Sequence, residues 1–291
     1  MSTNTRNVPD FIGIGAQRCG TTWLDTQLRR HPQLYLPQRR KEVHYFDEYH
    51  DRGPAWYREF FPDEEIAGRR AVGEITPKYL FDPACAGRIH AEFPDAKLLV
   101  VLRNPTERAY SQYGLHVGRY ARGGGFAEFL ADQPDAVERG RYAAQLERYF
   151  ALFPRERVLV MLFEEVMADR VAALDEVCRF LGVDTGLLDG DRVDDQVNAS
   201  ERPRFARARS LATRFGNRLR GRDMDWIINL AKKAGVMKLF GVRKGMPPLP
   251  DAERARLDAC FADDIARLEI LLGRSLDIWR APSQIDLPGA A

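Results

Sequence analysis

The feature that most constrains the fold is a junction near the N-terminus, where an apolar run, a glycine-rich loop and a helical pattern follow one another. The run Phe11-Ile-Gly-Ile-Gly is short and apolar, as a buried strand is. The helical pattern extends from Thr22 to Arg30 and is stopped by Pro32. A strand that passes through a tight loop into a helix is typical of parallel α/β sheets, so the junction predicts a fold of that class.

The same alternation continues along the chain. Two further apolar runs have the character of buried parallel strands, at Lys97–Leu102 and Arg157–Phe163. Helical patterns accompany them at Pro83–Phe93, Pro105 to about Tyr120, Tyr142–Phe153, Glu164–Leu181 and Asp251–Leu272. We therefore predict an α/β fold of three layers, with a central, mostly parallel β-sheet flanked by helices. In such folds the ligand binds beyond the carboxyl ends of the strands.

The length of 291 residues suits a single domain, and we predict one that spans residues 1–291. The stretch of about 184–250 loses clear periodicity and is rich in arginine, so it is predicted to be an irregular or lid-like insertion. Two interpretations of its arginines stay open: a solvated face, or a mobile lid that faces the acceptor.

Composition excludes several classes of function. The 44 Lys and Arg residues nearly balance the 42 Asp and Glu residues, giving a formal charge of +2, which does not indicate a partner such as a nucleic acid polymer. The four cysteines are dispersed, without the spacing of a disulfide framework or a zinc site. No apolar run approaches the roughly 18 residues of a membrane span. We therefore predict a cytoplasmic protein without a membrane span, and the sequence leaves its oligomeric state open.

The loop from Gly13 to Trp23 has the properties of an anion site. Backbone N–H groups at the start of a helix lack acceptors within the helix, and the helix dipole adds positive charge there. Thr21 and Thr22 add hydroxyl groups, and Arg18 adds a guanidinium group that binds two oxygens at once. A nucleoside-triphosphatase loop would need lysine at position 21, and a dinucleotide fingerprint would need glycine at position 18.

A second anion contact is predicted in the segment from Arg103 to Ser111. Arg103 directly follows a predicted strand, and Asn104-Pro105 has the chemistry that begins a helix. Ser111 lies about two turns into that helix, where its hydroxyl group could share an anion with Arg103. The competing interpretation is a helix cap beside a surface arginine.

Together these motifs resemble those of the sulfotransferases that use 3′-phosphoadenosine 5′-phosphosulfate (PAPS), in particular the heparan-sulfate-type and bacterial branch. The resemblance covers nearly the whole chain and implies a P-loop-like fold. It implies that the loop Gly15–Trp23 binds the 5′-phosphosulfate and that Arg103 and Ser111 bind the 3′-phosphate, with help from Lys244 and Gly245. In the first loop the implied contacts come from Arg18, Cys19, Gly20, Thr21, Thr22 and Trp23.

Two further segments carry the resemblance on the acceptor side. Lys41-Glu-Val-His-Tyr-Phe-Asp is similar to the family segment K-E-x-H-[FY]-F-D, whose glutamate is the catalytic base, so Glu42 is our choice of base. His44 is an alternative base because its side chain titrates near neutrality. Gly73-Glu-Ile-Thr-Pro-Lys-Tyr resembles the segment that lines the acceptor side. We therefore expect Lys41, Glu74 and Lys78 on that side, with Glu74 as a third candidate for the base.

The sequence departs from the family pattern at three positions. Arg18 stands where relatives usually carry lysine, and because arginine cannot plausibly shuttle a proton, its expected role is positional and electrostatic. Ile75 stands where heparan-type enzymes carry a second lysine, for which Lys78 is a candidate substitute. Met246 stands where an arginine often follows K-G.

We predict an enzyme that transfers a sulfuryl group from PAPS to a hydroxyl group or amine, releasing 3′-phosphoadenosine 5′-phosphate (PAP), without a metal ion. The acceptor is predicted to be a small molecule, a lipid or a carbohydrate. The aromatic residues between Tyr45 and Tyr57 either stack on it or belong to the core. Two alternatives remain: a kinase-like phosphoryl transferase, which would need Mg²⁺ ligands, and a nucleotide-binding module without catalysis.

Overall fold

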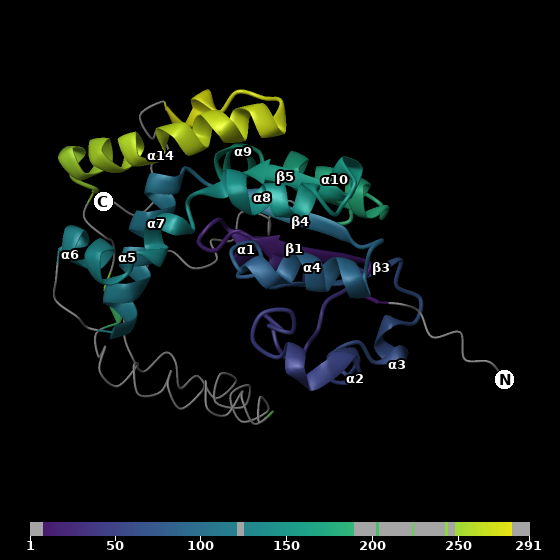
Figure 1. Cartoon of the computed structure of the whole chain (residues 1–291). Coiled ribbons are helices and arrows are strands. Elements are labelled where there is room, and N and C mark those ends of the chain that lie inside the picture. Colours follow the sequence, from purple (N-terminus) through teal and green to yellow (C-terminus); the bar gives the residue numbers. More distant parts are fainter. Residues whose placement is uncertain are drawn as a thin grey trace. The chain divides into compact units, whose positions relative to one another are not determined.

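The computed structural model describes residues 8–120, 125–188, 202–203, 223, 242–243 and 248–280 (Figure 1). These residues form two compact units. The first unit takes the residues up to Asn104, from Arg141 to position 188 and from Asp263 to Ile278, and the second takes the others. The single domain predicted for residues 1–291 stays a prediction. Most of the predicted insertion at 184–250, with Lys244 and Gly245, lies outside the described residues.

The first unit is built around a parallel sheet of five strands, in the order β2-β3-β1-β4-β5. The bounds of these strands are β1 Phe11–Gly15, β2 Leu34–Tyr35, β3 Ala71–Ile75, β4 Lys97–Leu102 and β5 Val158–Leu162. Every residue of β1 and β3 is buried, as expected for strands covered on both faces. The predicted α/β fold with a central parallel sheet flanked by helices is confirmed.

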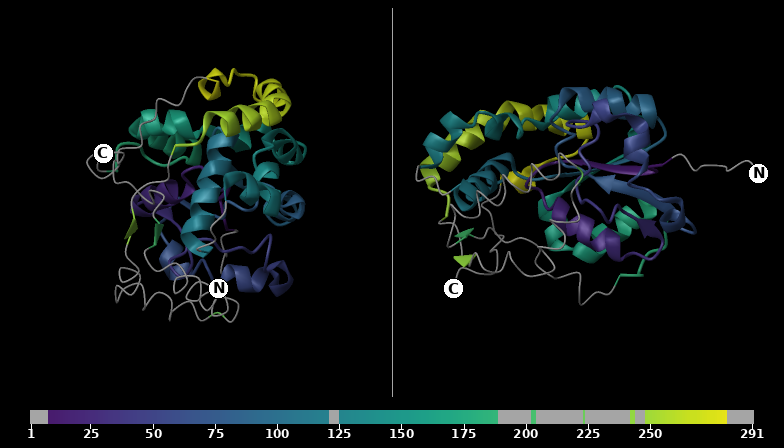
Figure 2. Two further views of the ribbon diagram at one scale, coloured as in Figure 1. Left: turned by 90° about the vertical axis from the view of Figure 1, so that its left-hand side faces the viewer. Right: turned by 90° about the horizontal axis from the view of Figure 1, so that it is seen from below.

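Helices cover both faces of this sheet. The helices of the first unit are α1 Thr21–Arg30, α2 Gly53–Arg58, α3 Asp63–Ile66, α4 Pro83–Glu92, α8 Tyr142–Phe150, α9 Phe163–Ala168 and α10 Arg170–Leu181. Figure 2 shows α1 and α10 on one side of β1 and α4 on the other. This placement follows from right-handed crossovers: the chain leaves β1 toward β2 but leaves β3 toward β4, in the opposite direction across the sheet.

The second unit is mainly helical. It contains α5 Pro105–Tyr120, α6 Phe126–Asp132, α7 Asp135–Glu138, the short antiparallel pair β6 Arg202–Pro203 and β7 Val242–Arg243, and the first half of α14 Asp251–Leu272. Thr106 of α5 donates a hydrogen bond of 2.6 Å to Asp258 of α14, and Arg254 pairs with Glu107 at 2.6 Å. These contacts join the start of α5 to the start of α14.

The parallel sheet brings the ends of its strands to one edge. The register pairs Ile12 of β1 with Glu74 of β3, and Gly15 of β1 with Val100 of β4. The segments that follow β1, β3 and β4 therefore begin at the same edge, which is where the sequence places its candidate site residues.

Within the described ranges, no helix is both long enough and apolar enough to cross a membrane. The cytoplasmic location proposed from the sequence stays a prediction.

Candidate active site

The glycine-rich loop connects β1 to α1 at the carboxyl edge of the sheet. Two of its residues have left-handed backbone conformations, Arg18 with φ of 72° and Gly20 with φ of 81°. Gly20 is the N-cap of α1, and no side chain caps the helix there. The first N–H groups of α1 therefore have neither an acceptor within the helix nor a side-chain cap, which is the geometry that binds an oxyanion.

The side chains of the loop divide into a buried set and a half-buried set. Cys19 and Trp23 are buried, and the Cys19 thiol faces the Gln17 carbonyl at 3.6 Å and the Tyr142 hydroxyl at 3.8 Å. These two predicted ligand residues therefore do not present their side chains at the surface of the site, and the backbone N–H group of Cys19 donates to the Ala16 carbonyl at 3.3 Å. Arg18 and Thr22 are half-buried, so their side chains reach the surface of the site.

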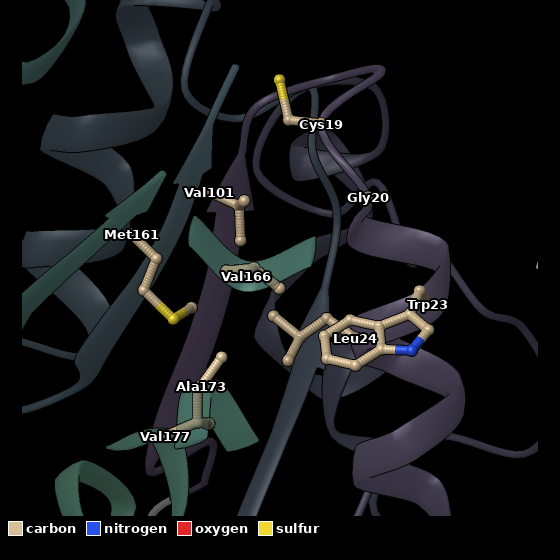
Figure 3. A pocket seen from close by; sticks show the side chains of 9 residues that line it. All are labelled: Cys19, Gly20, Trp23, Leu24, Val101, Met161, Val166, Ala173 and Val177. Carbon is tan, nitrogen blue, oxygen red and sulfur yellow. The ribbon is translucent and has the colours of Figure 1, made fainter. Parts of the chain in front are cut away.

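A small apolar cavity lies beneath the loop, between α1, α9, α10 and the sheet (Figure 3). In Figure 3 the side chain of Leu24 from α1 converges with those of Met161 and Val166. This apolar packing anchors the first turn of α1 from below, so the N–H groups above it are held in place.

Lys41 links the loop to the predicted base. Its ammonium group lies 3.0 Å from the Thr22 hydroxyl and 3.1 Å from Glu42 Oε1. One lysine therefore places the start of α1 and the Glu42 carboxylate side by side. A cation between them also compensates the negative charge that both the carboxylate and a bound anion would bring.

Glu42, His44 and Asp47 form a chain of contacts. The second oxygen of Glu42 is 3.4 Å from His44 Nε2, and Asp47 Oδ2 is 3.0 Å from His44 Nδ1. Burial by itself lowers the pKa of His44, but hydrogen bonds to Asp47 and Glu42 raise it to about 9. Burial raises the pKa of Glu42, yet the hydrogen bond with His44 and the charge of Lys41 lower it to about 2. At neutral pH the pair is an imidazolium beside a carboxylate.

Lys78 lies at the far end of this chain. Its ammonium group is 3.4 Å from Asp47 Oδ2 and 2.9 Å from Glu48 Oε1. His44, Asp47 and Glu48 also present ligand atoms within 4.8 Å of one another, a grouping that could accept a metal ion. The absence of a metal ion from the reaction stays a prediction, as does the role of Lys78 as a substitute for a second lysine.

Glu74 does not lie where the sequence analysis expected it. Its side chain is fully buried, at 0% exposure, and its carboxylate accepts hydrogen bonds from Thr76, Tyr79 and Tyr57. A carboxylate enclosed in this way cannot reach an acceptor hydroxyl group. We therefore place Glu74 beneath the site rather than on its substrate side or in the role of a base.

The predicted 3′-phosphate residues are divided between the two units. Arg103 follows β4 in the first unit and is half-buried, with its guanidinium 4.8 Å from the centroid of the Phe163 ring. Ser111 lies on α5 in the second unit. Lys244 and Gly245 lie outside the described residues. The joint role of these residues stays a prediction.

The aromatic stretch contains both core and surface residues. Tyr45, Phe46 and Tyr57 are buried; the rings of Tyr45 and Tyr57 stack with their centroids 4.5 Å apart, and Phe46 packs edge-on against both. Tyr49 and Trp56 are half-buried, and the guanidinium of Arg52 lies 5.0 Å from the Trp56 ring. The core interpretation therefore holds for three of the aromatic residues, whereas the other two reach the surface.

Sequence reasoning missed the hydroxyl groups below the site. Thr76 accepts backbone hydrogen bonds from Val43 at 3.0 Å and from His44 at 3.4 Å, and Tyr79 accepts one from Tyr45 at 2.9 Å. Both residues stand in the segment Gly73–Tyr79 that carries the resemblance, but its pattern does not say what they contact.

Comparison with known proteins agrees with this geometry. The family model of the sulfotransferase domain matches residues 8–202. The chain is 33% identical over 186 residues to human heparan sulfate glucosamine 3-O-sulfotransferase 6, a match that covers 61% of this chain and 53% of that protein. It is 31% identical over 297 residues to human bifunctional heparan sulfate N-deacetylase/N-sulfotransferase 3, covering 94% of this chain and 31% of that protein. The chain thus spans about half or less of these curated relatives.

Among solved structures, a sulfotransferase from Alicyclobacillus acidocaldarius has the same fold, with a TM-score of 0.67 and 33% sequence identity. The match covers 94% of this chain and 99% of that one. The chain therefore belongs to the family of PAPS-dependent sulfotransferases. The kinase-like alternative is not favoured by these findings.

Proposed function

We propose that this protein transfers the sulfuryl group of PAPS to a hydroxyl group or amine of its acceptor, with Glu42 as the general base. In the proposed reaction the acceptor atom bonds to sulfur and loses its proton to Glu42. The bond between sulfur and the bridging oxygen of the phosphosulfate breaks, and PAP leaves with that electron pair.

The observation that carries the proposal is the chain of contacts from the uncapped start of α1 to the base. The Thr22 hydroxyl, the Lys41 ammonium group and the Glu42 carboxylate follow one another at 3.0 and 3.1 Å. A group held by the N–H groups of α1 would therefore lie next to a carboxylate, with a cation between them. General base catalysis needs this proximity of base and reacting group.

Three cationic groups have distinct proposed roles. Arg18 and the N–H groups of α1 would stabilise the phosphate oxygen that gains charge as its bond to sulfur breaks. Lys41, which contacts both Thr22 and Glu42, would fix the position of the base relative to the loop that binds the donor. Arg103, with Ser111, Lys244 and Gly245, would bind the 3′-phosphate of the nucleotide.

For the acceptor, we propose a carbohydrate as the first class to test. The relatives named above act, by their names, on heparan sulfate. The half-buried Tyr49 and Trp56 beside Arg52 provide aromatic and cationic surface of the kind that contacts sugars bearing acidic groups. Small-molecule and lipid acceptors are the other arms of a screen with labelled donor.

The test of the base is the substitution Glu42→Gln. We expect it to lower turnover roughly 10²–10⁴-fold, the usual contribution of a general base, while PAP affinity stays near the wild-type value. Initial rates with labelled donor and calorimetry with PAP measure the two effects. The matched control is Glu147→Gln, which removes an exposed carboxylate paired with Arg267 on the first unit and should leave both values unchanged. Unchanged turnover of the Glu42 variant would transfer the role of base to His44.

A further inference from the structure

A buried carboxylate lies under the proposed base. Glu74 is at the carboxyl end of β3, and three hydroxyl groups converge on it. Tyr79 donates to Oε1 at 2.8 Å, Tyr57 donates to Oε1 at 3.1 Å, and Thr76 donates to Oε2 at 2.6 Å. Burying a carboxylate is costly, and it is tolerated here because three donors satisfy it. The reaction proposed above gives this group no chemical step.

The hydrogen bonds of Glu74 fix the direction of those around it. A hydroxyl group has one proton, so a hydroxyl that donates to Glu74 can only accept from its other neighbours. Thr76 uses its oxygen to accept the N–H groups of Val43 and His44, and Tyr79 accepts the N–H group of Tyr45. The carboxylate thus orients two hydroxyl groups that together bind three consecutive backbone N–H groups.

Those three residues directly follow Glu42 in the chain and include His44. The backbone of His44 has φ of 60°, a left-handed conformation that is unfavourable for a non-glycine residue and that persists only where the surroundings hold it. In this conformation the His44 ring contacts Glu42 through one nitrogen and Asp47 through the other. The hydroxyl groups of Thr76 and Tyr79 hold the N–H groups of residues 43–45, while the His44 carbonyl accepts the N–H groups of Glu48 and Tyr49, both at 3.0 Å.

We propose that Glu74 is a positioning residue: acting through the hydroxyl groups of Thr76 and Tyr79, it locks residues 43–45 and so keeps His44 against the Glu42 carboxylate. This inference rests on the proposed function, because it supposes that Glu42 is the base. Glu74 itself touches neither substrate nor reacting atoms.

The electrostatics agree with this role. Burial raises the pKa of Glu74, and hydrogen bonds from Thr76, Tyr79 and Tyr57 lower it again, leaving a pKa of about 7. The charged groups that surround His44 come from its own segment and from β3 and the turn after it: Lys41, Glu42, Asp47, Glu74 and Lys78. Since the imidazolium of His44 is held by the carboxylates of Glu42 and Asp47, any loosening of the segment lowers the pKa of His44.

The chain offers a matched pair of substitutions for the test. Tyr79→Phe and Tyr57→Phe each remove one phenol that donates to the same oxygen of Glu74. Only the Tyr79 hydroxyl also accepts a backbone N–H from residues 43–45, within the described part of the chain. A purely structural role of Glu74 predicts similar effects of the two variants, whereas positioning predicts that only Tyr79→Phe disturbs the site.

A second pair tests the other hydroxyl group. Thr76→Val removes it while keeping the shape of the side chain, and Thr76→Ser restores it. We expect Tyr79→Phe and Thr76→Val to lower kcat roughly 10-fold to 100-fold, the effect of a small misplacement of a catalytic group, with PAP affinity unchanged. Thr76→Ser and Tyr57→Phe should keep the maximal kcat of their pH profiles within about threefold of the wild-type maximum, although Tyr57→Phe also removes a hydrogen bond that lowers the pKa of Glu74.

The readout independent of turnover is the pKa of His44, followed by NMR titration of the ring. It should fall by about one unit or more in Tyr79→Phe and Thr76→Val and stay near 9 in Tyr57→Phe and Thr76→Ser. An unchanged pKa of His44 in both Tyr79→Phe and Thr76→Val overturns the positioning role, whatever their turnover. The proposed function would be contradicted by a different result, namely full activity of the Glu42→Gln variant. The two failures are therefore distinguishable.

Discussion

At the scale of the residue, His44 decides between the two candidate bases. Its ring nitrogens contact Glu42 and Asp47 at 3.4 and 3.0 Å, and these contacts raise its pKa to about 9. A histidine that is already protonated at neutral pH cannot take up the proton that the hydroxyl group or amine of the sulfuryl acceptor loses. Glu42, whose pKa is lowered to about 2, is ionised over the whole working range. Of the two, Glu42 is therefore the one that is unprotonated at neutral pH, which supports its proposed role as the base, and the contact with His44 would orient its carboxylate.

This assignment predicts the pH dependence of turnover. Glu42 is ionised throughout the accessible range, so the acid limb should instead follow Glu74, which loses its proton near pH 7 and only then accepts all three hydroxyl groups. We expect kcat to rise as the pH passes about 7 and not to rise again through pH 9, where His44 becomes neutral. Rates from pH 5 to 10 at saturating donor measure this profile.

The control for the profile is Glu74→Gln, which has no ionisable group at that position and should lose the limb near pH 7. An increase in the wild-type rate through pH 9 would show that neutral His44 is the base. A limb near pH 7 that persists in Glu74→Gln would contradict the assignment of this limb to Glu74.

At the scale of the element, the turn between β1 and α1 depends on one glycine. Gly20 has φ of 81°, and a Cβ atom there would lie 3.0 Å from the Phe163 ring. Gly68, with φ of 75°, has the same backbone requirement but open space around it. Substitutions at both glycines share the cost of the strained backbone conformation, but only a substitution at Gly20 also moves the loop. Comparing the two variants therefore separates these two costs.

We predict that Gly20→Ala weakens PAP binding, whereas Gly68→Ala does not. Both variants should lose roughly 1–2 kcal/mol of unfolding free energy, because alanine is strained in the left-handed region. Only Gly20→Ala also pushes the start of α1 against Phe163, which shifts the N–H groups that bind the anion. Denaturant unfolding and calorimetry with PAP measure the two effects. Equal PAP affinity of Gly20→Ala and the wild type would argue against the loop as the phosphate site.

The helices and strands also show which parts of the fold can be predicted from sequence patterns. The predicted bounds of β1, β4 and α14 agree with the structure, because a buried run or a long amphipathic pattern is a strong local signal. The strand β3 was missed since Gly73 and Glu74 interrupt its apolar pattern. The helix predicted over Glu164–Leu181 is two helices, and Asp169 begins the second by accepting a hydrogen bond from Ala172.

The candidate site likewise has a part that sequence motifs predict and a part that they do not. Arg18, Thr22, Lys41, Glu42 and His44 were predicted from motifs; all lie in the first unit, and contacts join the last four of them in a chain. The burial of Glu74 and the contacts of Thr76 with residues 43 and 44 could not be predicted. The contacts of Thr76 join residues more than 30 positions apart, and the environment of Glu74 includes Tyr57 from α2, so a local pattern carries no signal for either.

At the scale of the whole molecule, nearly balanced charge is combined with local cationic sites. The formal charge of +2 gives the chain little long-range attraction for a polyanion, so binding of a small nucleotide that carries several negative charges must come from local groups. In the first unit these groups are the start of α1 with Arg18, and Arg103 after β4. Each would bind a different phosphate of the same nucleotide, so both phosphates should contribute to the stability of the complex.

Thermal unfolding tests this last point. At 100 times its dissociation constant, PAP should stabilise the folded chain by about 2.7 kcal/mol, which for a chain of 291 residues corresponds to a rise in Tm of about 4–5 °C. Adenosine 5′-phosphate at the same concentration, which lacks the 3′-phosphate, should raise Tm less, and Arg103→Ala should reduce the PAP shift toward that smaller value. EDTA should leave the PAP shift unchanged, because the proposed contacts are protein cations and N–H groups rather than a metal ion. A shift that requires Mg²⁺, or one that is equal for both nucleotides, would refute this account of how the nucleotide is bound.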